Sequence, residues 1–383
     1  MKKVSNQINN SWQYHFEEAG FDYHSLSGKY WIDNYHLELK QEEANAMELA
    51  ANEVHAMCIE MVSENIRKGN FEKYGLNRFV ISAMERSWKN KDFHLYGRFD
   101  FAFDGTGNPK MLEYNADTPT SIVETAIAQN VWKKMQWEEF GVQYNMINRL
   151  EEAFKNRFKI WQSLNEGKNF YFAADELVIE DWGNVLALMN WAKDVGIDAK
   201  SIDFQDILYS TNKLEFQNQE GQRIDTLFKL YPWEFIFNEF NFGDYEVSTT
   251  QMVEPMWKGL LSTKAILPML WDMFKGHKNL MPAFFNEEEM LKVSKSYVKK
   301  PIYSREGANI EVIRDNSIID TADGDYGAEG HIYQEYAKMA SIDNAWYVFG
   351  TWIIGDKMEG LSVREDKTVI TKNTSLFVPH NIV

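Results

Sequence analysis

Two carboxylates, an amide and an arginine in one short stretch carry the clearest chemistry in this 383-residue chain. They lie on two extended segments, LYGRFDFAF and KMLEYN, that flank a turn-rich sequence, DGTGNP. Because side chains alternate between the faces of a strand, Arg98 and Asp100 share one face, and Met111, Glu113 and Asn115 share another. A hairpin symmetric about the turn places Asp100 opposite Glu113 and Arg98 opposite Asn115. Facing carboxylates repel, so a cation is expected between them.

The oxygen atoms of Asp100, Glu113 and Asn115 form a hard ligand set, which suits Mg²⁺ held jointly with the phosphates of a substrate. Arg98, beside them, could neutralise a phosphoryl group or a developing oxyanion. The alternative is a solvated polar face on which Arg98 simply pairs with both acids. The residues of the hairpin leave both interpretations open.

Basic residues that could meet phosphates lie elsewhere. The segment YVKKPIYSREGANIEVI places Lys300 at the end of an expected strand and Ser304, Arg305 and Gly307 in the loop that follows. Such a loop can aim backbone N–H groups at phosphate oxygens, with the basic side chains supplying charge. Lys264 begins an expected helix in STKAILPMLW. When each is considered alone, the simpler interpretation of Lys264 and Lys300 is that they are ordinary surface lysines.

Two further features stay open in the same way. The segment 323–330, DGDYGAEG, suits either a mobile cover over a site or a long turn, and Arg364 in LSVREDKTVI is equally ambiguous.

The sequence contains no G-x-x-x-x-G-K-[ST], G-x-S-x-G, H-E-x-x-H or C-x-x-C pattern. An activated serine or a zinc hydrolase is therefore not expected.

Composition and charge restrict the class of protein. Hydrophobic residues make up 44% of the chain, and no uncharged apolar run is long enough to span a membrane. The net charge of −17 opposes general binding to nucleic acid and favours a cationic partner such as an amine. Cys58 is the single cysteine, so a disulfide framework is excluded. We expect a cytoplasmic protein, and the periodicity favours neither a monomer nor a dimer.

The elements that position these residues fall into three interlocked stretches of an α/β (α+β) fold. Residues 1–165 form a helical part with the hairpin, residues 166–249 a βαβ-like part, and residues 250–383 a part rich in strands. One strand of the last part, AWYVFGTWII, is apolar enough to be buried on both faces. Helical periodicity or stop signals predict helices at 41–67, near 119–138 and 143–164, at 184–193 and at 263–274.

Five segments follow one another along nearly the whole chain: RFDFAFDGTGNPKMLEYNADTPTS, KLYPWEF, STKAILPMLW, KKPIYSREGANI and VRED. In sequence and in order they resemble the glutathionylspermidine synthase family. The resemblance is to members that contain the synthetase unit without an amidase domain. It implies an ATP-grasp fold with an additional βαβ-like substrate subdomain in 166–249 and the nucleotide-binding part in 250–383. It also implies an ADP-forming carboxylate–amine ligase that uses ATP and Mg²⁺ and works through an acyl phosphate.

The same resemblance assigns roles to residues. It implies Mg²⁺ ligation by Asp100, Glu113 and Asn115, and contact of Arg98 with both the γ-phosphate and the reacting carboxylate. Arg98 and Arg305 would be the catalytic residues. Substrate contacts would come from Thr118 for a peptide and, by a weaker match, from Glu180 and Asp181 for an amine. The nucleotide contacts would be Arg98, Lys264, Lys300, Ser304, Arg305, Gly307, Gln334, Glu335, Tyr336 and Arg364.

Two departures concern the substrates. Leu230 stands where the family uses a threonine for glutathione, and the region of Ser375 and Leu376 lacks an aspartate that the family offers to a polyamine. The reaction type is therefore carried over better than the substrate pair, for which glutathione or a similar peptide plus a polyamine is the first choice. Two alternatives stay open: a noncatalytic nucleotide- or peptide-binding regulatory protein, and an ATP-grasp ligase for unrelated small carboxylates.

Overall fold

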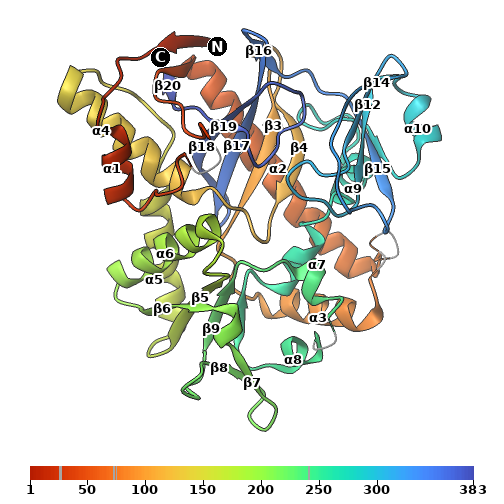
Figure 1. The fold of residues 1–383 in the computed structure, drawn as a ribbon. Coiled ribbons are helices and arrows are strands. Elements are labelled where there is room, and N and C mark those ends of the chain that lie inside the picture. The colour runs from red at the N-terminus through yellow and green to blue at the C-terminus, as the bar shows by residue number, and fades with distance from the viewer. Residues whose placement is uncertain (26–27, 72–73, 75, 240–241) are drawn as a thin grey trace.

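The computed structural model describes residues 1–25, 28–71, 74, 76–239 and 242–383. Its largest sheet is built around β17 (Ala345–Ile354), which is buried along nearly its whole length, as its apolar sequence predicts. β17 pairs antiparallel with β3 (Tyr96–Ala102) on one side and with β18 (Lys357–Asp366) on the other. Short strands complete this central sheet (Figure 1): β4 (Lys110–Asn115), β16 (Ala340–Ile342) and β19 (Leu376–Phe377).

The hairpin of β3 and β4 has the register that the sequence predicts at the carboxylates. Arg98 pairs with Asn115, and Asp100 pairs with Glu113. The aromatic face of β3 lies in the core, where the ring of Phe99 stacks on the ring of Tyr114 with centroids 3.8 Å apart. Burial of that face leaves the polar face of the hairpin to line the site.

A β-bulge follows directly beyond the carboxylates. The register shifts between Asp100 and Phe101, so that Phe101 pairs with Met111. Met111 is buried in the same core cluster as Phe101, whereas Leu112 packs with Ala102 in another. The expectation that Met111 shares the face of Glu113 was therefore wrong, because one extra residue on a bulged strand reverses the alternation.

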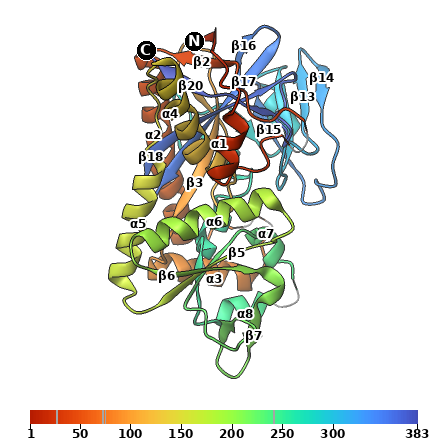
Figure 2. The ribbon, with the colours of Figure 1, turned by 60° about the vertical axis from the view of Figure 1, so that its left-hand side comes forward.

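A parallel sheet forms from the middle of the chain, where the sequence predicts a βαβ pattern. Its strands, in spatial order, are β10 (Gln251–Val253), β9 (Thr226–Lys229), β5 (Asn169–Ala174) and β6 (Asp198–Asp203). Helix α6 (Ile179–Asp194) connects β5 to β6 and lies over the sheet (Figure 2), which confirms the βαβ prediction. The division of the chain at 165 and 249 stays a prediction, and β10 lies just past its second boundary.

A second antiparallel sheet comes from the last third of the chain and lies beside the central sheet in Figure 1. Lys300 is near the end of β12 (Tyr297–Pro301), the middle strand of this sheet, as expected. The strands, in spatial order, are β11 (Ala283–Phe284), β15 (His331–Glu335), β12, β13 (Glu311–Arg314) and β14 (Ser317–Thr321). Helices α9 (Ile266–Met273) and α10 (Glu287–Leu291) pack on it.

The long helix α2 (Gln41–Lys68), expected at 41–67, runs behind the central sheet (Figure 1). Cys58 and His55 on this helix are buried. Burial also raises the pKa of the Cys58 thiol, which opposes a nucleophilic role.

The remaining helices differ from the expected ones mainly at their starts. The helix expected near 119–138 begins with a π-helical segment, η2 (Val123–Ala128), and continues as α4 (Gln129–Phe140). The helix expected at 143–164 is α5 (Leu150–Leu164), because the preceding residues instead bond to the C-terminal strand, for example Ile382 N–H to Asn145 O. The other helical elements are α1 (Trp12–Glu18), α3 (Arg78–Asn90), η3 (Phe204–Asp206), α7 (Trp233–Ile236), α8 (Phe242–Val247) and η4 (Met256–Leu260).

The two ends of the chain meet in a small sheet, in which β2 (Tyr35–Leu39) pairs with β1 (Lys2–Ser5) and β20 (His380–Ile382). A short hairpin, β7 (Leu208–Ser210) and β8 (Glu215–Gln217), projects from the parallel-sheet part. Within the described ranges, no helix has both the length and the apolar character needed to cross a membrane.

Candidate active site

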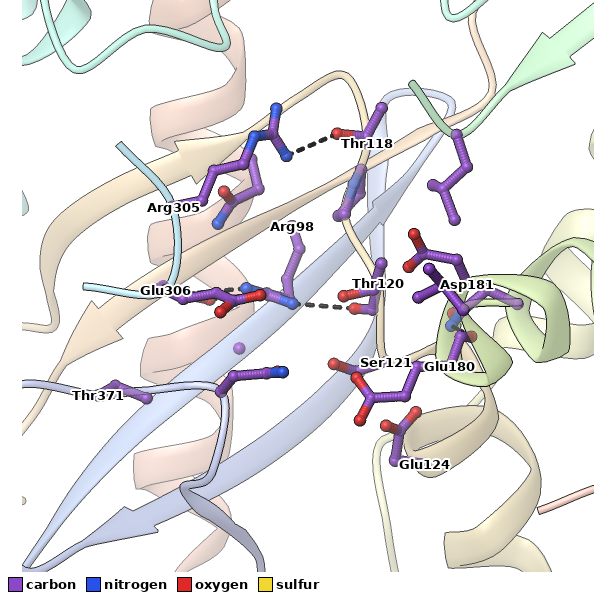
Figure 3. A pocket seen from close by; sticks show the side chains of 18 of the residues that line it. Arg98, Thr118, Thr120, Ser121, Glu124, Glu180, Asp181, Arg305, Glu306 and Thr371 are labelled. Carbon is purple, nitrogen blue, oxygen red and sulfur yellow. Dashed lines mark hydrogen bonds and ion pairs between the residues drawn. The ribbon is translucent and has the colours of Figure 1, made fainter. Parts of the chain in front are cut away.

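Two cavities meet at the carboxylates of the hairpin. The first, of about 470 Å³, lies between the hairpin, α6, the start of α7 and the loop after β12 (Figure 3). The second lies between the hairpin and the sheet that contains β12 and β15. Asp100 and Glu113 line both cavities. The residues with the strongest expected chemistry therefore stand where contents of the two cavities would touch.

Glu113 is held in its ionised form by two lysines from distant segments. Its Oε2 lies 3.2 Å from Lys264 Nζ, and its Oε1 accepts a hydrogen bond from Asn115 Nδ2 at 3.1 Å. Burial acts to raise the pKa of Glu113, but the charges of Lys264 and Lys300 outweigh it and lower the pKa to about 2. An ionised carboxylate is thus available for a cation at neutral pH.

Asp100 is paired with Arg98 on its own strand. Arg98 donates from Nε to Oδ1 at 2.8 Å and from Nη2 to Oδ2 at 3.1 Å, which is a bidentate pair. Its Nη1 donates to Thr120 O at 2.9 Å, so all three contacts fix the plane of the guanidinium. Burial raises the pKa of Asp100, Arg98 counteracts this, and the neighbouring charge of Glu113 raises the pKa further.

These residues fit Mg²⁺ in the way expected of a phosphate-bound ion. In the part of the chain that the structure describes, no three His, Cys, Asp or Glu side chains gather to hold a metal by themselves. Mg²⁺ commonly uses only one or two carboxylates and completes its shell with water and substrate phosphates. Asp100 and Glu113, with the amide of Asn115 beside them, supply such a partial set.

The second cavity combines apolar walls with a buried lysine. Lys300 Nζ donates to Gln334 Oε1 at 2.7 Å and to Leu112 O at 2.9 Å, which ties the middle strand to the hairpin. An ammonium group has three donors, so one is left for a ligand. Burial lowers the pKa of Lys300 to about 8 even though Glu113 acts to raise it. The expected residues Gln334, Glu335 and Tyr336 line this cavity together with Val298, Ile310, Val312, Met339, Val348 and Val369.

The loop 304–309 closes over the junction of the two cavities. Lys264 Nζ donates to Ser304 O at 2.8 Å, and Arg305 Nη1 donates to Thr118 Oγ1 at 2.9 Å (Figure 3). Gly307 lines both cavities and has a φ of 75°. We call residues 304–309 the covering loop.

Gly307→Ala should displace the covering loop. A Cβ at this position would lie 2.7 Å from Ile370 Cγ2 and 2.8 Å from Thr371 O, and the positive φ adds strain. We expect ATP-dependent turnover to fall by about tenfold or more, with a change in Tm of less than about 4 °C. Gly221→Ala is the matched control, because Gly221 has a φ of 73° and a Cβ added there would meet none of the described residues beyond its chain neighbours within 4 Å. Equal turnover in the two variants would contradict a functional role for the loop position.

Acidic side chains form another wall of the first cavity. Glu180 and Asp181 of α6 line it, and Glu124 of η2 lies on the same side (Figure 3). Glu124 is buried and accepts hydrogen bonds from Tyr30 OH at 2.8 Å and Tyr23 OH at 3.4 Å. Glu124 was not among the residues expected from the sequence, and the one available signal was a single acid within the apolar run SIVETAIA. π-Helical segments such as η2 occur frequently at functional sites.

Three other residues or segments of the sequence analysis lie less directly at the cavities, and their expected roles stay predictions. Arg364 lines the first cavity, but its guanidinium donates to the carbonyl oxygens of Lys372, Asn373 and Ser375, so it supports a turn. Ser304 lines neither cavity as described. The same holds for the segment 323–330, which packs behind the covering loop, where Tyr326 N–H donates to Asn309 Oδ1 at 2.8 Å.

Comparison with known proteins shows what the chain is related to. The family model described as glutathionylspermidine synthase preATP-grasp matches residues 3–383. A Haemophilus influenzae protein that carries a provisional name as an acid–amine ligase is 36% identical over 377 residues, covering 95% of each chain. The bifunctional glutathionylspermidine synthetase/amidase of Escherichia coli is 24% identical over 385 residues, which cover 92% of this chain and 60% of that longer protein.

A solved structure supports the fold assignment. A glutathione synthetase-like effector from Globodera pallida superimposes with a TM-score of 0.60 at 10% identity, covering 99% of this chain and 98% of that one. At that identity the likeness concerns the fold alone, which is of the ATP-grasp type. With a family model that matches nearly every residue and relatives named as ligases and synthetases, the chain is a ligase that belongs to the glutathionylspermidine synthase family.

Proposed function

We propose that this protein uses ATP and Mg²⁺ to join a small carboxylate to an amine through an acyl phosphate, with release of ADP. The observation that carries the proposal is the pair Asp100 and Glu113, which lines both cavities at once. Nucleotide in the second cavity would present its terminal phosphate at this pair, and the acid in the first cavity would meet it there. A glutathione-like peptide and a polyamine are the first substrates to test.

The residues around the pair match the charge that such a reaction moves. A free carboxylate is a poor acyl donor, and transfer of a phosphoryl group to it supplies a good leaving group. Arg98, Lys264 and Lys300 spread the negative charge that passes between the two cavities. Mg²⁺, when bound, would neutralise charge on the transferring phosphoryl group.

The acidic wall suits the amine. An ammonium group is attracted to carboxylates, and it must lose a proton before its nitrogen can attack the acyl carbon. Burial raises the pKa of Glu124 to about 7, and burial together with Glu180 raises the pKa of Asp181 to about 6. Carboxyl groups with such values can accept protons near neutral pH, whereas ordinary carboxylates are too acidic.

The pH dependence of amide formation tests whether Glu124 accepts the proton of the amine. Glu124 is faced by Tyr23 and Tyr30 from the N-terminal segment, by Glu180 of α6 and by Arg364 of β18. Below its pKa of about 7 the carboxyl is protonated and cannot take a proton, and above it the group is ionised. We expect the rate of the wild type divided by the rate of Glu124→Gln to rise about tenfold between about pH 6 and about pH 8. Because the amine substrate titrates equally in both assays, its own titration drops out of this ratio. A flat ratio would exclude Glu124 as the acceptor.

The proposal as a whole is tested by a condensation screen. Purified protein is incubated with Mg-ATP and a grid of thiol peptides, amino acids, other small acids and polyamines. Mass spectrometry then searches for a product equal to acid plus amine minus water. Leu230, which is buried and lines the first cavity, favours including acids unrelated to glutathione. ADP formation that depends on an added acid supports the proposal, and its absence across the grid counts against it.

A further inference from the structure

Arg305 of the covering loop is held from the opposite side of the first cavity. Its Nη2 donates to Glu234 Oε1 at 2.7 Å, while its Nη1 donates to Thr118 Oγ1 at 2.9 Å. The Glu234 side chain is only 10% exposed, and Glu234 belongs to α7 in the parallel-sheet part of the fold. The two contacts thus span from the sheet that carries the covering loop to α7 and to the end of the hairpin.

The two partners of Arg305 are themselves locked together. Asp117, next to Thr118, accepts from Lys229 Nζ at 2.9 Å and from Trp233 N–H at 2.7 Å. Asp117 and Lys229 are almost completely buried, at 1% and 2% side-chain exposure. A buried pair with these extra hydrogen bonds resists displacement, so Thr118 and Glu234 form a rigid cradle.

Glu234 does not itself reach the cavity. Arg305 and Thr118 line the first cavity, whereas Glu234 is absent from the described lining. Its Oε2 is buried and has no hydrogen-bond partner among the described residues, and neither has Arg305 Nε. Burying a carboxylate with one unsatisfied oxygen is costly, and the contact that compensates for it is the one with Arg305.

We propose that Glu234 is a positioning residue that holds Arg305 against Thr118 and thereby keeps the covering loop closed across the cavity. This inference rests on the proposed function for its consequence. An acyl phosphate that meets water reverts to free carboxylate and inorganic phosphate, because the oxygen of water attacks and the phosphate leaves. Each such event consumes one ATP without forming an amide. A loosened loop would therefore uncouple ADP formation from amide formation.

The position of the loop is tested without any substrate. Trypsin cleaves after arginine, and the rate of cleavage at the Arg305–Glu306 bond reports how often this segment opens. We expect Glu234→Ala and Glu234→Gln to raise that rate by roughly tenfold, because loss of one charge-assisted hydrogen bond changes the equilibrium for opening by about that factor. Glu239→Gln is the control, since Glu239 accepts from Tyr231 OH at 2.6 Å in the same segment, whereas the described side-chain partners of Arg305 are Thr118 and Glu234. Equal cleavage in all four proteins would overturn the inference.

The second readout is the coupling ratio. With the acid found in the condensation screen and hydroxylamine as the acceptor, ADP and hydroxamate are counted in parallel. Glu234→Ala should raise the ratio of ADP to hydroxamate by roughly tenfold, because water competes once the loop is released. A purely structural role lowers both rates together, and such an unchanged ratio would overturn the inference. A wild-type protein that forms no ADP would refute the proposed function instead, while the trypsin comparison still decides the role of Glu234.

Discussion

Glu113→Gln is expected to abolish ADP formation while leaving the fold intact. Glutamine keeps the size of the side chain and removes its charge, so the cation expected between Asp100 and Glu113 loses an ionised ligand. The change also leaves Lys264 and Lys300 without the carboxylate that they now share. We expect turnover to fall by more than about 100-fold, beyond the usual cost of altering a group that only orients a metal ligand.

A thermal-shift measurement and a control variant separate this effect from damage to the fold. Mg-ATP should raise the Tm of the wild-type protein and raise that of Glu113→Gln much less, because a ligand stabilises only the state that binds it. Glu311→Gln is the matched control, since Glu311 pairs with Lys299 at 2.7 Å on the neighbouring sheet and is absent from the described lining of both cavities. Unchanged turnover in Glu113→Gln would refute the metal assignment.

Arg98→Ala is expected to remove product formation far more than ATP binding. Arg98 lines the first cavity, and the described lining of the second cavity does not include it. Its fixed guanidinium stands where charge develops on the acid, so we expect product formation to fall by about 100- to 1000-fold. The dissociation constant for Mg-ATP, measured by calorimetry, should change by less than about tenfold.

Arg98→Lys controls for charge in this experiment. Lysine keeps the cation that counteracts the rise in the pKa of Asp100, but it cannot reproduce the bidentate contact or the bond to Thr120 O. A variant that retains ATP binding and still loses most of its turnover would assign the function to geometry. Equal loss of ATP binding and product formation in Arg98→Ala would mean that Arg98 anchors the nucleotide only.

Local pattern was sufficient for the hairpin, with one exception. Alternation and a turn-rich sequence predicted that Asp100 faces Glu113, and the structure has this register. The same reasoning misplaced Met111, because a bulge after Asp100 shifts the phase by one residue. A strict period of two cannot reveal a bulge, whose position depends on what the strand packs against.

Partners of charged side chains were much harder to predict. Arg364 lines the first cavity, but its hydrogen bonds to three carbonyl oxygens of a turn had no signal in the sequence. The sequence analysis did not predict Glu124 or Glu234 as residues of the site, because the sequence around a single acidic residue does not show whether its side chain will be buried. Their settings depend on Tyr30 and Arg305, which are distant along the chain.

The sequence by itself determined the chemistry available at the hairpin, the βαβ pattern of the middle part and, through the resemblance, the family. These depend on neighbouring residues or on motifs that survive in order along the chain. Tertiary structure alone decided that Lys264 pairs with Glu113, that two cavities share the carboxylate pair, and that Arg305 is held by Glu234. The physical reason is that burial and pairing of charges arise only when strands such as β3 and β17, distant along the chain, are brought together.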